Sequence, residues 1–266
     1  MIAIRFEHIK TVQHDIGNGV TVPKFATTSS NTQVVVKTFN GPQGNLVLFN
    51  EYLCYRLALL LDVPMPFSGI CLLDNNTDIY NNCVEDNQLG YGFYSTYLNK
   101  VVPLVDSIIP LIANKKIFFR ILLFDHVIFN SDRNLGNLLV QYYKNNINLY
   151  VIDHTHVFIN QTIWDSNCLL RAINEKDYRS TTVLERNYNL YRMFFNNLYL
   201  SNTTFSDLII IFKQKVTEEK IKEYISEIPE SWRPPQKDLD ALVRYILYRI
   251  EHLEEICFTI INYINK

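Results

Sequence analysis

Residues 130–139 read Asn-Ser-Asp-Arg-Asn-Leu-Gly-Asn-Leu-Leu, and residues 151–154 read Val-Ile-Asp-His. Asn137 lies five positions after Asp132, and Asp153 lies twenty-one positions after it. In phosphoryl transfer, one carboxylate orients the attacking hydroxyl, while an amide oxygen and a second carboxylate hold the magnesium that neutralises phosphate charge. Magnesium takes a few hard oxygen ligands and keeps its waters, so one Asn and one Asp suffice. The spacing therefore predicts a phosphoryl-transfer site.

The same loop also has a plain structural interpretation. Asn, Asp and Gly crowd ordinary connections because they tolerate turn geometry, and residues 130–136 contain all three. Two flanking features favour the catalytic interpretation. The apolar segment Ile117–Phe129 precedes the loop, and residues 138–141 and 149–152 after it are predicted to pair as a β-hairpin. A loop between two such elements holds its polar side chains at the mouth of a core.

A lysine and a glutamate upstream fit the same chemistry. Lys37 ends a predicted β-strand over residues 32–39, and Glu51 lies in the first turns of a helix predicted from Leu48 to Leu61. In kinases a strand lysine contacts the nucleotide phosphates, and a helix glutamate holds that lysine in place. An edge-strand lysine and a solvated glutamate are the alternative. Agreement with the Asp132 cluster favours the catalytic interpretation.

Residues 27–31 (Thr-Thr-Ser-Ser-Asn) form a polar tip before the lysine strand, where a phosphate-covering loop is expected. Backbone amides and the hydroxyls of Ser29 and Ser30 can bind phosphate oxygens there. An ordinary β-turn fits this tip equally well. A second turn is marked by the Gly-Asn-Gly of residues 17–19. The sequence contains no G-x-x-x-x-G-K-[ST] or G-x-G-x-x-G motif.

Arg133 and three histidines each allow two interpretations. Arg133 can contact phosphate as a bidentate donor or form a structural salt bridge, and the sequence leaves both open. His126, His154 and His156 invite a metal cluster, since alternate residues of a strand face the same side. Packing roles are favoured because no Cys or carboxylate set completes a tetrahedral zinc site.

The 266 residues allow one large domain or two lobes around a cleft, and a hydrophobic fraction of 48% predicts a packed core. A net charge of −2 without a Lys/Arg-rich run argues against direct nucleic-acid binding and against a phosphoinositide surface. Residues 1–10 lack a signal-peptide core, and no apolar run approaches the roughly 20 residues of a spanning helix, which predicts a soluble cytoplasmic protein without membrane contact. The cysteines lack metal-ligand spacing and are predicted to be free thiols: Cys54, Cys71, Cys83, Cys168 and Cys257.

The pattern of elements predicts an α+β fold of two lobes. Residues 1–98 are predicted to form a β-rich, nucleotide-binding N-terminal lobe with one helix. Within it, Gln88–Tyr97 is weakly patterned and is expected to line or hinge the cleft. Residues 99–266 are predicted to form a larger, mostly helical C-terminal lobe with the catalytic loop and metal site. Its helices are predicted over Ala113–Phe129, Tyr188–Leu200, Thr217–Ile225 and Leu239–Ile261.

Five stretches of this sequence, taken together, resemble the HipA-like kinases. They are Val34-Val-Val-Lys37, the run from Phe49 to Pro66, Asn130-Ser-Asp-Arg133, Asn137-Leu-Leu-Val140 and Ile152-Asp-His154. The likeness is greatest to the short, stand-alone HipA-like kinase domain, and it extends from about residue 17 to the end. Residues 227–232 (Glu-Ile-Pro-Glu-Ser-Trp), followed by a long helix, are also similar to that group. Phosphatidylinositol-kinase-like enzymes share the Asp-Arg and Asn pattern.

The resemblance implies a bilobal protein-kinase-like fold, ATP with magnesium as cofactors, and phosphorylation of a hydroxyl, most often a Ser or Thr of a protein. Carried over by position, Asp132 matches the catalytic Asp, while Asn137 and Asp153 match the magnesium ligands. Lys37 matches the nucleotide-phosphate lysine, and Glu51 matches its partner. A protein substrate is implied, and a regulatory or antitoxin-like partner protein is compatible with the likeness.

Two positions depart from the family pattern. Asn134 stands where relatives often have His, and Thr155 stands where Gly often follows the Ile-Asp-His run. The polar tip taken as the phosphate loop also lacks glycine. These departures keep two alternatives open. One is a pseudokinase that serves as a nucleotide- or protein-binding module, and the other is a lipid or small-molecule kinase.

Overall fold

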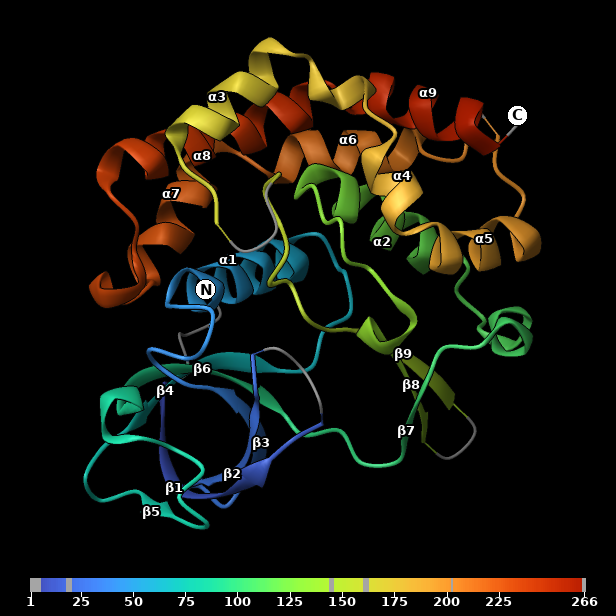
Figure 1. The fold of residues 1–266 in the computed structure, drawn as a ribbon. Coiled ribbons are helices and arrows are strands. Elements are labelled where there is room, and N and C mark those ends of the chain that lie inside the picture. Colours follow the sequence, from blue (N-terminus) through green and yellow to red (C-terminus); the bar gives the residue numbers. More distant parts are fainter. Residues whose placement is uncertain (1–5, 18–20, 144–145, 160–162, 202, 265–266) are drawn as a thin grey trace.

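The computed structural model describes residues 6–17, 21–143, 146–159, 163–201 and 203–264. A curled β-sheet forms one lobe and a group of helices forms the other, with helix α1 (Leu46–Leu60) lying between the sheet and the helices (Figure 1). This is a bilobal α+β architecture, as the sequence predicts. The predicted boundary between the lobes at residue 98 stays a prediction.

The N-terminal lobe contains a six-stranded sheet in the order β2-β3-β6-β4-β1-β5. Strand β1 also pairs antiparallel with β2, so the sheet curls back on itself as seen in Figure 1. The strands are β1 (Phe6–Asp15), β2 (Lys24–Thr28), β3 (Gln33–Lys37), β4 (Ser68–Leu73), β5 (Asp78–Ile79) and β6 (Gly90–Thr96). The short strand β5 falls inside residues 74–82, for which the sequence predicts a polar connection.

Strand β3 shows how the sheet positions the lysine. Its alternate residues Val34 and Val36 are fully buried in the core of the sheet, because successive side chains of a strand face opposite sides. Val35 and Lys37 therefore face the other side, where they line a pocket. The prediction that Lys37 ends a strand is confirmed.

The sequence predicts that residues 88–97 line or hinge the cleft, and the lining part is confirmed because Phe93, Ser95, Thr96 and Tyr97 line the pocket. These residues contain β6, which pairs with both β3 and β4 in the middle of the sheet. Gly92 explains the weak sequence pattern, because a Cβ at this position would lie 2.8 Å from the carbonyl oxygen of Lys37. The glycine lets two backbones approach closely, and the residues after it line the pocket.

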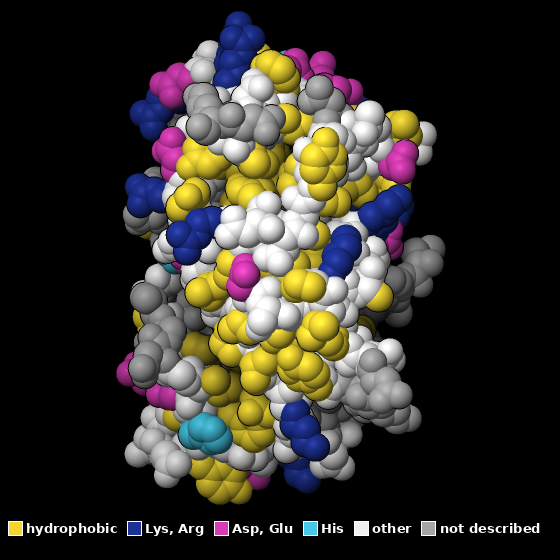
Figure 2. All heavy atoms as spheres, turned by 90° about the vertical axis from the view of Figure 1, so that its right-hand side faces the viewer, with side chains coloured by type: hydrophobic (Ala, Val, Ile, Leu, Met, Phe, Trp, Pro, Cys, Tyr) yellow, Lys and Arg dark blue, Asp and Glu magenta, His cyan; other side chains and the backbone are white. Residues whose placement is uncertain are grey.

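The second lobe combines a small sheet with helices. Strands β7 (Val101–Pro103), β8 (Leu138–Tyr143) and β9 (Asn146–Val151) are antiparallel neighbours, which confirms the predicted β8–β9 hairpin, although Lys144 and Asn145 at its predicted polar tip lie outside the described residues. The α-helices are α2 (Lys116–Val127), α3 (Ser166–Asn174), α4 (Thr182–Arg186), α5 (Tyr188–Asn197), α6 (Ser206–Lys215), α7 (Glu218–Glu227), α8 (Gln236–Glu251) and α9 (Leu253–Ile264). Viewed from the side that carries the hairpin and α5, hydrophobic side chains gather over the middle of the surface among scattered charges (Figure 2).

The single helix predicted over Leu239–Ile261 is wrong, because the chain turns at His252 between α8 and α9. The imidazole of His252 stacks on Tyr178 with ring centroids 4.0 Å apart. The turn also lets Leu253 and Ile260 of α9 become fully buried. An uninterrupted apolar pattern in sequence thus conceals a break that tertiary packing produces.

Helix α1 is fastened to the helical lobe. The guanidinium of Arg56 pairs with Glu227 of α7 and lies 4.4 Å from the ring centroid of Tyr224. The hydroxyl of Tyr52 donates to the same Glu227 carboxylate at 2.9 Å. Because Glu51 lies on this helix, these contacts fix the glutamate relative to the second lobe.

No helix in the described ranges has the length and apolar character needed to cross a bilayer. Residues 1–5, which include half of the stretch considered for a signal peptide, lie outside those ranges. The five cysteines are free thiols, as predicted, and three of them are buried.

Candidate active site

A pocket of about 380 Å³ lies between the large sheet and the β8–β9 hairpin, a volume in the range of small-ligand sites. Its walls are largely apolar, and charged side chains stand among them. The apolar part includes Val35, Met65, Phe93, Val101, Leu139 and Ile152, and the charged part is Lys37, Glu51 and Asp153. An apolar slot with a few charged groups suits a ligand that has a flat apolar ring and an anionic group.

Lys37 joins the charged groups of this pocket. Its Nζ donates to Asp153 Oδ1 at 3.0 Å and to Thr155 Oγ1 at 2.9 Å, and it also forms an ion pair with Glu51. Burial lowers the pKa of Lys37, but the carboxylates of Asp153 and Glu51 outweigh burial and raise the pKa overall. The lysine therefore carries its charge in the cleft.

Glu51 is 1% exposed and holds the rear of the cluster. Burial raises the pKa of its carboxyl, and the neighbouring Lys37 opposes this rise. Its Oε1 also accepts a hydrogen bond from the backbone N–H of His154 at 3.2 Å, and it lies 3.3 Å from Thr155 Oγ1. Helix α1 thereby contacts both the lysine strand and the segment that follows β9.

Asp153 lies two residues beyond the end of β9, in the left-handed region with φ of 60°. Its Oδ1 accepts from Thr155 Oγ1 at 2.7 Å and from the Thr155 backbone N–H at 3.3 Å. Burial alone would raise its pKa, but Lys37 and the Thr155 hydroxyl more than offset burial and hold the pKa well below its usual range. Asp153 is therefore ionised at neutral pH.

Asp132 and Asn137 lie on the loop that follows α2. Asn130 Oδ1 accepts from the Asp132 backbone N–H at 3.0 Å, and Asn137 Nδ2 donates to the Asp132 carbonyl oxygen at 2.8 Å. The carbonyl oxygen of Asn137 accepts from the backbone N–H of Ile152 at 3.0 Å. These bonds bring the Asp132 loop against the residue that precedes Asp153, so residues far apart in sequence meet at one place.

Arg133 forms a structural salt bridge and does not face the pocket with Lys37. Its Nη2 lies 2.8 Å from Asp125 Oδ1, and both side chains are fully buried. Nη1 donates to the carbonyl oxygen of Ile152 at 2.7 Å, and Nη2 lies 2.9 Å from His154 Nε2. Arg133 thus connects α2, the catalytic loop and the segment of Asp153.

Comparison with known sequences and structures adds the family to this geometry. The sequence profile described as HipA-like kinase matches residues 9–189, which is more than half of the chain. The chain belongs to the HipA-like kinase family. No curated protein sequence matches it.

Solved structures show the protein-kinase-like fold of this HipA-like kinase. The proinflammatory kinase CtkA of Helicobacter pylori is similar, with a TM-score of 0.60 and 13% identity over 93% of this chain and 94% of that one. A Golgi casein kinase with Mn/ADP bound is similar with a TM-score of 0.53 and 14% identity, over 95% of this chain and 74% of that one. Membership of the HipA-like kinase family supports phosphotransferase chemistry, and the two solved structures support the fold.

The turn taken as the phosphate loop of this HipA-like kinase is not at the pocket, which corrects the expected location. Ser30 Oγ bonds Glu7 at 3.2 Å and Thr28 at 2.8 Å, and neither Ser29 nor Ser30 lines the pocket. The β1–β2 connection reaches the pocket instead, through Ile16, Thr21 and Pro23. This connection contains Gly17 and Gly19 in sequence, although residues 18–20 lie outside the described ranges. The segment that lines the pocket therefore contains glycine, unlike residues 27–31.

The predicted metal ligands have the donor chemistry that a hard cation requires. Within the described residues, Asp153 uses only Oδ1 in hydrogen bonds, so Oδ2 stays available. The bond from Asn137 Nδ2 to the Asp132 carbonyl fixes the amide and leaves its Oδ1 as a free acceptor. One carboxylate and one amide oxygen fit magnesium or manganese. Zinc has no such match, because the described residues contain no group of three or more His, Cys, Asp or Glu placed to hold a metal.

Sequence reasoning missed two residues of the site. Asn187 Oδ1 accepts from the Arg133 backbone N–H at 2.7 Å, and its Nδ2 donates to the Asn130 carbonyl oxygen at 2.8 Å. The hydroxyl of Tyr191 donates to Asp125 Oδ2 at 2.9 Å. Both come from the start of α5, more than fifty positions from the residues they support, and no local motif marks them.

Proposed function

We propose that this HipA-like kinase transfers the γ-phosphate of ATP to a hydroxyl group, with magnesium, and that the acceptor is a Ser or Thr of a protein. The observation that carries the proposal is the triangle of Lys37, Glu51 and Asp153 at the end of the apolar pocket. A charged lysine tied to a helix glutamate and to an ionised aspartate is the arrangement that phosphoryl transfer uses.

The pocket supplies binding and orientation. Val35, Phe93 and Leu139 provide apolar surface for a purine ring, and residues 96–98 border the same space. Lys37 would donate to the phosphate oxygens, while Glu51 holds the ammonium in place. Asn137 and Asp153 would hold the divalent cation, and a cation bound there neutralises phosphate charge. Positioning and electrostatics supply most of the rate in such a site.

Asp132 would act on the acceptor. Its carboxylate would accept a hydrogen bond from the acceptor hydroxyl and align the oxygen with the γ-phosphorus. The new bond joins that oxygen to phosphorus, and the bond from phosphorus to the bridging oxygen of the nucleotide breaks. The hydroxyl proton passes to Asp132 and then to solvent. Asn134 Nδ2 lies 3.4 Å from Asp132 Oδ1 and, being an amide, can orient that carboxylate but cannot titrate.

The test compares the wild type with Asp132→Asn in transfer of labelled phosphate to a mixture of proteins, followed by mass spectrometry of the modified residue. Asp207→Asn on the exposed surface of α6 is the matched control. We expect phosphoserine or phosphothreonine with the wild type and the control, and a loss of about 10³-fold with Asp132→Asn. Stabilisation by ATP and magnesium without any transfer by the wild type would replace this proposal with a pseudokinase.

A further inference from the structure

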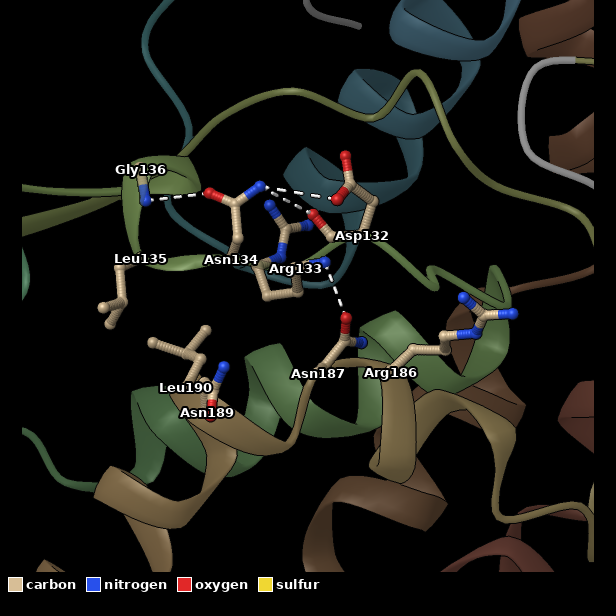
Figure 3. A pocket seen from close by; sticks show the side chains of 9 residues that line it. All are labelled: Asp132, Arg133, Asn134, Leu135, Gly136, Arg186, Asn187, Asn189 and Leu190. Carbon is tan, nitrogen blue, oxygen red and sulfur yellow. Dashed lines mark hydrogen bonds between the residues drawn. The ribbon is translucent and has the colours of Figure 1, made fainter.

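A second cavity, of about 290 Å³, opens beside Asp132 and shares no lining residue with the apolar pocket described above. The catalytic loop lies above it, and the junction between α4 and α5 lies below (Figure 3). Its lining residues are Asp132, Arg133, Asn134, Leu135, Gly136, Arg186, Asn187, Asn189 and Leu190. Asp132 and Asn134, which can orient the Asp132 carboxylate, are shared with the proposed chemistry, so a group bound here would sit next to the acceptor hydroxyl.

Of the two arginines that line this cavity, one is paired with a carboxylate and the other is available to a ligand. Arg133 is fully buried and neutralised by Asp125, so it offers nothing to a ligand. Arg186 is exposed at the end of α4, and its guanidinium forms no ion pair or hydrogen bond with any described residue. The cavity therefore presents one unpaired cation and the single carboxylate of Asp132.

The cation stands on a fixed support. Asn187, the next residue, is 2% exposed and is bonded to the Arg133 N–H and to the Asn130 carbonyl of the catalytic loop. Backbone motion of Arg186 relative to Asp132 is therefore restricted, although its side chain reaches solvent. A cation held at a set place near a catalytic carboxylate can select among acceptors, whereas one on an independent surface loop cannot.

The rest of the cavity is neutral. Leu135 is 42% exposed and Leu190 is buried. Both lie on the side of the cavity opposite Arg186 in Figure 3, so that side is partly apolar. Asn134 Oδ1 accepts from the Gly136 N–H at 2.9 Å, and a Cβ at Gly136 would lie 3.2 Å from that oxygen. The loop is thus compact here, and the cavity has room for about one or two side chains of an extended chain.

We propose that this cavity is the acceptor subsite and that Arg186 selects a protein segment with an acidic side chain next to the phosphorylated Ser or Thr. The inference rests on the proposed function, since it takes Asp132 as the residue that meets the acceptor hydroxyl. A hydroxyl at Asp132 and a carboxylate at Arg186 complement the two charges of the cavity. A phosphorylated residue would offer the same anionic chemistry as Asp or Glu.

The test uses a peptide library with one fixed serine and one flanking position set to Glu, phosphoserine, Gln or Lys, read by transfer of labelled phosphate. The best Glu peptide and its Gln twin are then compared by fluorescence anisotropy, which reports binding even if no phosphate is transferred. The variants are Arg186→Gln, Arg186→Glu and the control Arg192→Gln, an exposed residue of α5 outside the cavity.

We expect the wild type and Arg192→Gln to favour the Glu peptide over its Gln twin about threefold to fivefold, the range for a partly exposed ion pair. Added salt should reduce this ratio. Arg186→Gln should bring the ratio to about one, and Arg186→Glu should favour the Lys peptide. A stronger preference for phosphoserine than for Glu would identify the anion as phosphate.

Equal binding of Glu and Gln peptides by the wild type would overturn the inference, as would a preference that survives in Arg186→Gln. These results differ from a failure of the proposed function. If binding favours Glu and depends on Arg186 while no peptide or protein is phosphorylated, the subsite stands and the assignment as a kinase of proteins fails.

Discussion

The two acidic segments of the site are held in opposite ways. The Asp132 loop is fixed from below by a buried network, in which Arg133 and Asp125 are both fully buried and Asn187 and Tyr191 complete the bonds. Asp153 is fixed within the cleft itself, where Lys37 and Thr155 bond its carboxylate and its side chain stays 36% exposed. The Asp132 loop is therefore held by buried side chains, and the Asp153 segment is held by groups that a ligand in the cleft can reach.

This difference separates stability from chemistry. The four side chains of the buried network do not line the apolar pocket, so their loss should weaken the fold. The bonds to Asp153 use charges that phosphates and a cation would engage, so their loss should weaken catalysis more than folding. The two segments still meet, because Arg133 donates to the carbonyl oxygen of Ile152, the residue before Asp153.

The largest expected effect is on phosphate transfer, and it concerns Asp153, whose carboxylate is held within the cleft. Asp153→Asn keeps the shape of the side chain but removes the charge that would hold a cation, so phosphate transfer should fall about 10³-fold. The free energy of unfolding should change by no more than about 1 kcal/mol, because the ion pair with Lys37 is partly exposed. Transfer kinetics and denaturant unfolding measure both. A wild-type rate in this variant would refute the metal assignment.

A change in the buried network under the Asp132 loop should mainly lower the free energy of unfolding. Arg133→Met leaves the Asp125 carboxylate buried without a cation, which typically costs about 3–5 kcal/mol in the free energy of unfolding. Arg192→Met, on an exposed face of α5, is the control and should cost little. The double variant Asp125→Asn/Arg133→Met should be more stable than the sum of the single effects predicts. Simple additivity would show that the network is not coupled.

Acid should also lower the free energy of unfolding, through a buried histidine of α2 next to Asp125. Burial lowers the pKa of His126 to about 3, and the hydrogen bond between its Nδ1 and the Leu122 carbonyl oxygen opposes this shift only in part. Its Nε2 is buried and has no hydrogen-bond partner among the described residues. The unfolded histidine binds a proton below about pH 6.5, so the free energy of unfolding should fall as pH decreases toward 3. The stabilising contribution is present above pH 6.5 and is lost on acidification.

Denaturant unfolding between about pH 5.5 and 4 measures this contribution, which should be at most about 1.4 kcal/mol per pH unit. His126→Phe should reduce the slope by that amount. The control His14→Gln, on the exposed face of β1, should leave it unchanged. His154 adds to the slope in the same direction, because burial lowers its pKa as well. An unchanged slope in His126→Phe would show that its burial does not exclude the proton.

The sequence predicted the charged residues of the cleft better than the buried residues that support the Asp132 loop. Lys37 and Glu51 are recognisable because each lies at a defined place in one local element, and their opposite charges make the contact expected. Asn187 and Tyr191 carry no such signal, since an amide and a phenol at a helix start are ordinary and their partners are distant in the chain. Only the fold brings them under the loop.

Two polar turns illustrate the same limit. Residues 16–23 and 29–32 each precede a strand, and composition favoured the turn with two serines. The fold decides between them, because Ile16, Thr21 and Pro23 of the first segment line the pocket. The β2–β3 turn is instead bonded back to β1 at Glu7 and His8. A sequence shows that a turn exists more readily than which side of the sheet it serves.

The smallest expected effect tests whether the Asp153 segment needs the hydroxyl of Thr155, at a position where the family often has glycine. Thr155 is 2% exposed, and its Oγ1 lies within hydrogen-bonding distance of Lys37, Asp153 and Glu51 at once. The hydroxyl has one proton and can donate to only one carboxylate at a time. We expect it to donate to Asp153 in the free protein and to Glu51 when Asp153 engages a cation.

Thr155→Val removes this hydroxyl while keeping a branched side chain, so kcat/KM for ATP should fall about tenfold, the value of one hydrogen bond to a charged group. Thr155→Ser should restore most of the activity, because it returns the hydroxyl. Calorimetric binding of the nucleotide with magnesium should show the same order of affinity without turnover. If Thr155→Val and the wild type have equal kcat/KM for ATP, the Thr155 hydroxyl is not needed. The ion pairs among Lys37, Glu51 and Asp153 would then suffice to position Asp153.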